Sequence, residues 1–270
     1  MTDAGQARLT RGIAEVYEEL FVPALLRGWA VCVADAARIE PGRRVLDVAC
    51  GTGVLAREAA ARAGAAGRVV GLDQSEEMLA VARRVAPGIE WRRGAAEALP
   101  FEDGSFDAVV SQFGLMFFAD RLAAIREMMR VLRPGGRLAV AVWDALENTE
   151  GYPELTALVA RLFGDAAAAG LRAPFRLGDP RALASLFAEA GVPGAQVATL
   201  AGTARFPSLD AWLFTEVKGW VLADEVSDAE FQRLRREAEK VLGRFAAGDG
   251  TVVLEAPAHV VTAAKGMIES

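Results

Sequence analysis

Cysteine, histidine and tyrosine are scarce in this chain of 270 residues, which contains two cysteines, one histidine and two tyrosines. Cys32 and Cys50 are too few for a disulfide framework or a metal-ligand set, and the sequence has no HExxH or CxxC motif. We therefore expect no metal cofactor, and a reducing compartment is the simpler assumption.

The chain also lacks an excess of positive charge and a long apolar run. Its 30 basic and 36 acidic residues give a formal charge of -6, which offers no general attraction to DNA or RNA. The first residues, MTDAGQARLTRG, are polar, and no apolar run approaches the ~18 residues that span a bilayer. We expect neither nucleic acid nor membrane as a partner, and a soluble, cytoplasmic protein. The oligomeric state is left open.

Apolar strand-like and helix-like segments alternate through the first half of the chain. Strands are predicted at 43–49, 68–73, 89–93, 106–112 and 137–143, and helices at 54–63, 76–85 and 120–132. Such alternation indicates right-handed βαβ units on a parallel sheet, with ligands at the carboxyl ends of its strands.

Composition and pattern predict one domain over residues 1–270, since 53% of the residues are hydrophobic. We divide it into an N-terminal helical cover (1–40, broken at 21–23 around a proline), a core (41–145), a mixed helical cap with sheet continuation (146–250) and a final strand (251–270). Within the cap, Asp179 is the expected N-cap of one helix, and Ser227 with Glu230 forms a capping box.

The stretch VLDVACGTGVLA contains Gly51, Gly53 and Ala56 at the spacing of a dinucleotide-binding fingerprint. The same turn also suits a nucleoside that carries no phosphate. Asp73 lies 20 positions after Gly53, where an acid accepts hydrogen bonds from ribose hydroxyls. Asp47 would oppose a pyrophosphate and suit an ammonium group, which favours a ligand with a cationic amino-acid moiety.

Two later segments extend the pattern: GAAEALPFEDGSFDAVVSQFGLMFF (94–118) and RVLRPGGRLAVAVW (130–143). Together with the glycine turn they resemble the class I S-adenosylmethionine-dependent methyltransferases, with the closest likeness to the branch that contains quinone-biosynthesis and natural-product enzymes. The resemblance implies a Rossmann-like α/β fold: a seven-stranded, mostly parallel sheet with an antiparallel last strand and helices on both faces. It also implies S-adenosylmethionine as cofactor and S-adenosylhomocysteine as product.

The resemblance assigns cofactor roles to particular positions. It places the methionine part near Asp47, Ala49, Gly51 and Gly53, the ribose at Asp73, the adenine between Gln74 and Met78, and the sulfonium near Gln112 and Phe113. Ala95, Ala96 and Glu97 align with a GDAE-like segment in which Ala95 stands where the family has an aspartate, so adenine recognition falls to the backbone around Ala96.

Tyr17 belongs to the N-terminal helical segment that covers the cofactor in the resembling proteins. Its hydroxyl either meets the methionine carboxylate, or its ring only completes an apolar helix face with Ile13 and Leu20.

Four residues are candidates for the acceptor side. His259, the single histidine, is either a base that deprotonates a hydroxyl acceptor or a structural residue. Met116 and Trp143 follow strands, so they either wall an acceptor pocket or pack in the core, and Trp212 is placed toward the cleft.

These observations favour methyl transfer from S-adenosylmethionine to a small, apolar or aromatic acceptor. Methyl transfer from a sulfonium is an in-line displacement that requires alignment and exclusion of water more than dedicated catalytic groups. Oxygen is slightly preferred over nitrogen or carbon as the methylated atom. The alternatives are an NAD(P)-dependent reductase and a protein that binds S-adenosylmethionine without chemistry.

Overall fold

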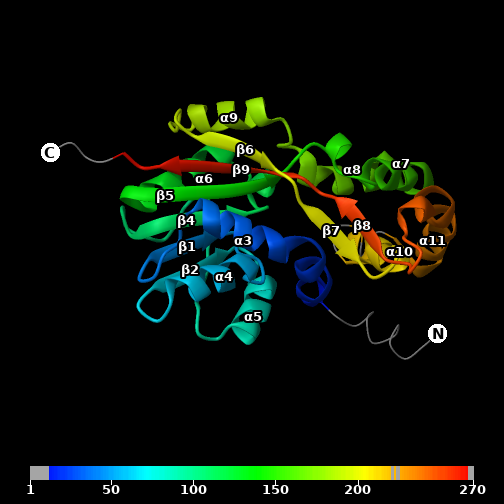
Figure 1. Cartoon of the computed structure of the whole chain (residues 1–270), viewed down its shortest axis with the longest axis horizontal. Coiled ribbons are helices and arrows are strands. Elements are labelled where there is room, and N and C mark those ends of the chain that lie inside the picture. The colour runs from blue at the N-terminus through cyan, green and yellow to red at the C-terminus, as the bar shows by residue number, and fades with distance from the viewer. Residues whose placement is uncertain (1–11, 220–221, 223–225, 267–270) are drawn as a thin grey trace.

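A seven-stranded sheet forms the centre of the computed structural model, which describes residues 12–219, 222 and 226–266 (Figure 1). In spatial order its strands are β3 (Glu90–Arg93), β2 (Arg68–Asp73), β1 (Arg44–Val48), β4 (Phe106–Gln112), β5 (Leu132–Trp143), β9 (Ala258–Ala264) and β6 (Gln196–Leu200). Strands β3, β2, β1, β4 and β5 pair in parallel, and β9 is antiparallel to both β5 and β6. The predicted Rossmann-like fold is confirmed.

Helices cover both faces of the sheet (Figure 1). One face carries α3 (Arg27–Ala36), which packs on α4 (Val54–Ala63), with α5 (Glu76–Val85) alongside β2 and β3. The other face carries α6 (Arg121–Val131), which packs on α9 (Pro180–Glu189). Ser75 caps α5, because its hydroxyl accepts a hydrogen bond from the Met78 amide. The Ser75 cap and the apolar helix faces place the helix ends close to where the sequence predicts them.

The N-terminal segment differs from its prediction in one respect. Instead of breaking at 21–23, the chain runs through α2 (Ile13–Val16), a π-helical stretch η1 (Tyr17–Leu26) and α3 without interruption. Pro23 lies inside the π-helical stretch. Because a proline lacks an N–H and its ring clashes in a regular α-helix, the wider turn accommodates it where a break was expected. Residues 1–11 of the predicted cover lie outside the described residues.

Between β5 and β9 the chain forms the cap, apart from α9 and β6, which belong to the main sheet and its helices. The cap consists of η3 (Leu146–Asn148), α7 (Tyr152–Phe163), α8 (Asp165–Arg172), η4 (Ala173–Phe175), α10 (Leu209–Leu213), the π-turn η5 (Phe214–Lys218), α11 (Asp228–Leu242) and η6 (Gly243–Phe245). Asp179 caps α9 as predicted, and the capping box of Ser227 and Glu230 opens α11.

The predicted final strand at 251–270 is two strands that belong to different sheets. β8 (Val252–Glu255) pairs with β7 (Thr203–Phe206) in a two-stranded sheet within the cap, and β9 then enters the main sheet. Pro257 separates them, since it cannot donate to a ladder. Residues 267–270 lie outside the described residues.

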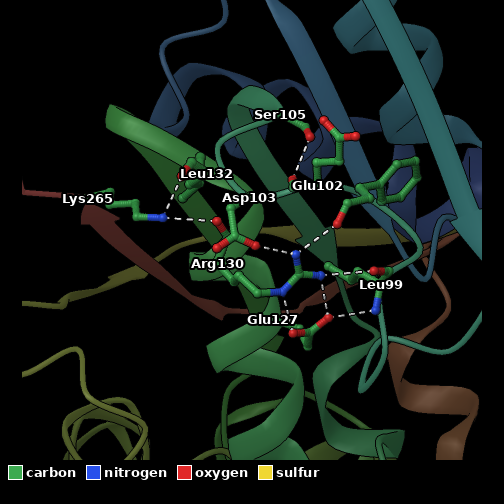
Figure 2. A network of polar contacts seen from close by, with 9 residues as sticks. Leu99, Glu102, Asp103, Ser105, Glu127, Arg130, Leu132 and Lys265 are labelled. Carbon is green, nitrogen blue, oxygen red and sulfur yellow. Dashed lines mark hydrogen bonds and ion pairs between the residues drawn. The ribbon is translucent and has the colours of Figure 1, made fainter.

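A network around Arg130 fixes the loop that follows β3 (Figure 2). The Arg130 guanidinium donates hydrogen bonds to the carbonyls of Leu99 and Phe101 and forms ion pairs with Asp103 and Glu127. Glu127 in turn accepts a 2.8 Å hydrogen bond from the Leu99 amide. The LPFEDGSFD segment is therefore tied to the end of α6, and this holds the preceding residues 94–97 at the edge of the sheet.

Among the helices of residues 12–219, 222 and 226–266, none combines the length and hydropathy that crossing a bilayer requires.

Candidate functional site

The glycine turn follows β1 at the carboxyl edge of the sheet. Ala49, Gly51 and Gly53 have φ angles of 57°, 55° and 89°, in the left-handed region. For Ala49 this conformation is strained, and such strain is concentrated at ligand sites. The Gly51 amide donates a 2.8 Å hydrogen bond to Asp73 Oδ2, and the Ser75 amide donates one of 2.8 Å to Oδ1. The turn after β1 and the acid that ends β2 therefore form one unit.

A cavity of about 420 Å³ opens beside this unit, within the usual range for small-molecule sites. Core and cap both line it. Of the residues predicted to bind the cofactor, those that line it are Tyr17, Ala49, Gly51, Asp73, Gln74, Met78, Ala96, Glu97, Gln112 and Phe113. Residues from four loops and from the N-terminal segment are thus brought to one place.

Three predicted cofactor residues do not line the cavity. Asp47 is buried, at 1% exposure. Gly53 packs against the Trp91 ring, where an added Cβ would clash, so its role is to let the turn approach that ring. Ala95 is exposed on the surface beside the cavity-lining Ala96.

Phe113 and Trp143 form an aromatic wall of the cavity. Their rings stack with centroids 3.7 Å apart and planes 3° from parallel, and Trp29 of α3 packs edge-on against both. Phe113 has a φ of 55°, a second strained position at the carboxyl end of a strand. The neighbouring Gln112 donates a 2.9 Å hydrogen bond to the Leu26 carbonyl, while its buried Oε1 has no partner among the described residues. That oxygen is a vacant acceptor beside the aromatic wall.

Glu97 fixes a loop on the opposite side of the cavity. Its Oε1 accepts hydrogen bonds from the amides of Ala119 and Asp120, at 3.1 and 3.5 Å. The contact joins the loop after β3 to the start of α6. Glu97 therefore has a structural partner whether or not it also contacts a ligand.

The charges in the cavity lining are negative. Asp73, Glu97 and Glu216 contribute carboxylates, and the lining contains no lysine, arginine or histidine among the described residues. Burial raises the pKa of Asp73, although the hydrogen bonds that its carboxylate accepts from backbone amides lower it. Burial also raises the pKa of Asp47 well above its usual range, and both of its oxygens lack partners in the described part of the chain. Such a site favours a cationic ligand and disfavours a pyrophosphate.

Tyr17 lines the cavity from η1, next to Gly51. A Cβ on Gly51 would lie 3.8 Å from the Tyr17 hydroxyl oxygen, so the two groups are close neighbours. Burial and the nearby carboxylates of Asp73 and Asp47 raise the pKa of Tyr17, so the phenol stays protonated and acts as a hydrogen-bond donor.

The structure does not bring His259 to the cavity, although β9 starts at the expected edge. Its partner across the β5–β9 ladder is Val142, whereas Trp143 pairs with Ala258. Because side chains alternate along a strand, His259 points to the face opposite Trp143. There its Nδ1 lies 2.9 Å from the Thr199 hydroxyl, and its Nε2 lies 2.9 Å from the Gly178 carbonyl.

Met116 and Trp212 are also away from the cavity surface, with 0% exposure each. Met116 packs in the main core, and Trp212 packs among cap aromatics, including Tyr152 at a centroid distance of 5.7 Å. Of the three residues predicted to form the acceptor pocket, Met116, Trp143 and Trp212, Trp143 is the one that lines the cavity.

Several cap residues in the lining were not predicted from the sequence, and two of them, Tyr152 and Glu216, are ionisable. Tyr152, at the start of α7, donates a 2.6 Å hydrogen bond to Glu216 Oε1 in η5. Burial raises the pKa of Glu216 to about 7, despite the opposing effect of this hydrogen bond. The residues are 64 positions apart, and no local motif marks either of them.

Within residues 12–219, 222 and 226–266, no group of three or more His, Cys, Asp or Glu could hold a metal ion.

Comparison with known proteins gives consistent results. Residues 46–140 match the model of a methyltransferase domain family. The chain is 50% identical over 115 residues to a demethylmenaquinone methyltransferase of Renibacterium salmoninarum, covering 43% of this chain and 47% of that protein. It is 39% identical over 151 residues to the ubiquinone/menaquinone biosynthesis C-methyltransferase UbiE of Hahella chejuensis, covering 53% and 61%. The matched part spans about half the length of these relatives.

The fold agrees with that of a solved structure, the YcgJ protein from Bacillus subtilis. The similarity covers 88% of this chain and 97% of that one, with a TM-score of 0.59 and 20% identity. The family match, the ordered motifs and the fold point the same way, and they agree with the resemblance seen in the sequence. Over residues 46–140 the chain is similar to a methyltransferase domain, and this match agrees with the motifs in the sequence.

Proposed function

We propose that this chain transfers a methyl group from S-adenosylmethionine to a ring carbon of a small quinone-type aromatic acceptor in its reduced, hydroxylated form. The observation that carries the proposal is that one cavity is lined by the glycine turn, Asp73, the aromatic wall and the cap. A cofactor and an apolar acceptor can therefore meet in one cavity.

The residues present fit S-adenosylmethionine. Gln112 lines the cavity and leaves one buried oxygen without a partner among the described residues, so the site has an unused acceptor for a ligand N–H donor, whereas the carboxyl of Asp47 is buried outside the lining. Gly51 presents backbone where a side chain would intrude. In this proposal Asp73 holds the ribose and Tyr17 donates to the methionine carboxylate.

The remaining cofactor contacts follow the same assignment. The turn around the methionine part is shaped by Ala49, Gly51 and Gly53. The adenine is surrounded by Gln74, Met78, Ala96 and Glu97, with Ala95 beside them. Gln112 and Phe113 lie next to the sulfonium, and Phe113 with Trp143 excludes water from it. When bound, the cofactor supplies an electrophilic methyl group on a sulfonium. The chain's own contribution is alignment and exclusion of water.

The acceptor class comes from the relatives and from chemistry. The Renibacterium salmoninarum relative is named a demethylmenaquinone methyltransferase, and the Hahella chejuensis relative is named a ubiquinone/menaquinone biosynthesis C-methyltransferase. The earlier preference for oxygen as the methylated atom has no support in these names, so we propose carbon. A sulfonium methyl requires an electron-rich carbon, which the reduced, hydroxylated ring supplies and the oxidised quinone does not.

Calorimetry and a labelled-methyl assay test this proposal against its rivals. We expect the chain to bind S-adenosylhomocysteine and not NADH, because the lining lacks a cation for a pyrophosphate. Methyl label from S-adenosylmethionine should then appear in reduced 1,4-naphthoquinone. Binding of NADH alone would indicate a reductase, and cofactor binding without label transfer to any hydroxyaromatic acceptor would indicate a binding protein.

A further inference from the structure

The cap end of the cavity holds a carboxylic acid that the cofactor assignment does not use. Glu216 lines the cavity, is 6% exposed, and lies with Tyr152 among Leu171, Pro174 and Phe175. Placing a carboxylate in apolar surroundings is unfavourable unless it is paired with a cation. Lys218, two residues further on, instead forms an ion pair with Asp228. A buried acid that faces a cavity and forms no ion pair among the described residues therefore calls for a functional explanation.

The local structure is arranged to hold Glu216 in this position. Glu216 lies in the π-turn η5, where the Gly219 amide bonds to the Phe214 carbonyl five residues earlier. Such turns inside helices are frequent at functional sites. The Thr215 hydroxyl stabilises the preceding helical turn through a 2.7 Å hydrogen bond to the Ala211 carbonyl.

Tyr152 is fixed from the other side. It begins α7 directly after Gly151, whose φ is 76° and where an added Cβ would lie 2.7 Å from the Trp212 ring. Its own ring packs against Phe175 and Trp212, at centroid distances of 5.6 and 5.7 Å. The phenol can therefore hold the carboxylate of Glu216 in one orientation. This also gives Trp212 a supporting role behind the cavity.

We infer that Glu216 is a catalytic residue of the proposed methyl transfer, as the acceptor of the proton from a ring hydroxyl group of the acceptor molecule. The inference rests on the proposed function. The acceptor's O–H bond breaks, its proton moves to the Glu216 carboxylate, and the electron pair stays on the acceptor and enriches the ring. The ring carbon then forms a bond to the methyl group while the S–C bond breaks and leaves its electron pair on sulfur. The ring hydrogen at that carbon then leaves as a proton to water, which restores aromaticity, and Glu216 returns its proton to the acceptor oxygen, so that one proton is released in each turnover.

The charges of the cavity favour a base in this position. Among the described residues, the lining contains no lysine, arginine or histidine. No cationic side chain therefore favours ionisation of the acceptor hydroxyl, and a base has to take its proton. A carboxylate whose pKa is raised toward neutrality is better matched to a hydroxyl proton than an ordinary one. Tyr152 is a positioning residue in this account, since it donates to Glu216 and stabilises its charged form.

The test uses the full chain, S-adenosylmethionine and reduced 1,4-naphthoquinone. We expect Glu216→Gln to lower kcat by about 100-fold or more, the usual contribution of a general base. The dissociation constant of S-adenosylhomocysteine should stay unchanged in calorimetry, and that of the naphthoquinol in the S-adenosylhomocysteine complex should change by less than about 10-fold. Glu239→Gln, an exposed acid on α11, is the matched control and should behave as wild type.

Tyr152→Phe separates a base from a structural residue. Loss of its hydrogen bond raises the pKa of Glu216, so the acidic limb of the kcat/KM profile should move to higher pH while the enzyme keeps its cofactor affinity. Glu216→Asp, which keeps the acid, should retain part of the activity.

If Glu216→Gln binds S-adenosylhomocysteine normally and keeps its kcat and acidic limb, Glu216 is not the base and the inference is overturned, although the proposed function stands. If Glu216→Gln does not fold, an unmoved limb in Tyr152→Phe overturns it in the same way. If the wild-type chain transfers no methyl group to any hydroxyaromatic acceptor, the proposed function fails first.

Discussion

The Gly51 amide donates a 2.8 Å hydrogen bond to the carboxylate of Asp73 and so ties the turn after β1 to the end of β2. The contact makes the glycine turn and Asp73, the acid proposed to bind the ribose, one structural unit. Asp73 also accepts from the Ser75 amide, so its carboxylate orientation is set before a ligand binds.

Replacing Asp73 with Asn should weaken cofactor binding. The amide cannot accept from both backbone N–H groups, and it loses the charge that strengthens bonds to ribose hydroxyls. We expect S-adenosylhomocysteine to bind about 10- to 100-fold more weakly by calorimetry, which corresponds to about 1.5–3 kcal/mol. Glu76→Gln, an exposed acid three residues later, is the control. Equal affinities in the two variants would refute the role of Asp73.

Replacing Tyr17 with Phe tests the contact to the methionine carboxylate. Because the raised pKa keeps the phenol protonated, its loss removes one donor to a charged group. Affinity for S-adenosylhomocysteine should fall by about 10-fold, with little change in melting temperature. An unchanged affinity would show that Tyr17 only walls the cavity with Phe21, its stacking partner at 5.7 Å.

Removing the Glu216 carboxylate should stabilise the fold above neutral pH. Its pKa is raised from 4.5 in the unfolded chain to about 7 in the folded protein, so the folded state binds the extra proton between these values. Stability is therefore lost as the pH rises through this window. Glu216→Gln should melt at a higher temperature than wild type at pH 8, with a smaller difference at pH 5. An equal difference at both pH values would contradict the raised pKa.

The pH dependence predicted here comes from the Glu216 carboxylate, because the ionisable groups packed around it either stay protonated or are paired with other charges. Tyr152 faces it from α7, and Tyr17 shares the cavity from η1, which contacts η5. Both phenols stay protonated in this range, because burial raises the pKa of each. Asp210 in α10 pairs with Arg235, and Lys218 in η5 pairs with Asp228.

His259→Gln should affect stability and not turnover. The imidazole joins β6 through Thr199 to the segment before α9 through Gly178, and its Nε2 also lies 3.2 Å from Asp144. Losing these buried hydrogen bonds costs about 1–3 kcal/mol. Thermal unfolding should report the loss, while kcat per folded molecule stays the same. A large fall in kcat with unchanged stability would return His259 to the mechanism.

Arg130→Ala should destabilise the loop at residues 94–105. The guanidinium bonds to the Leu99 and Phe101 carbonyls and to two acids (Figure 2), and its removal leaves the buried Leu99 carbonyl without that donor. We expect a loss of about 2–3 kcal/mol in denaturant unfolding. Arg126→Ala, at an exposed position of the same helix, should stay within about 0.5 kcal/mol of wild type. Equal losses would show that the network contributes nothing specific.

The sequence predicts the core of the fold well, because its signals there are local. Strands β2 and β4 and helices α4 and α5 begin and end where periodicity, glycines and the Ser75 cap indicate. The cofactor end of the site follows from the same core, since parallel strands bring the residues after their carboxyl ends together.

The acceptor end could not be predicted, because it depends on contacts between distant segments. The hydrogen bond from Tyr152 to Glu216 joins two helical elements with no shared motif, and the π-turn that redirects Glu216 has no sequence signature. The sequence leaves the role of His259 open for a different reason: its strand reaches the cavity edge, but the register that decides its face is set by pairing with Val142.

The most direct measurement of the central claim is the position of the transferred methyl group. The full chain is incubated with S-adenosylmethionine carrying an isotopically labelled methyl group and with reduced 1,4-naphthoquinone, and the extracted product is examined by NMR. The account predicts the label on a ring carbon, together with S-adenosylhomocysteine in equal amount. Label on an oxygen atom, or no transfer to this or any other hydroxyaromatic acceptor by a chain that binds the cofactor, would contradict it.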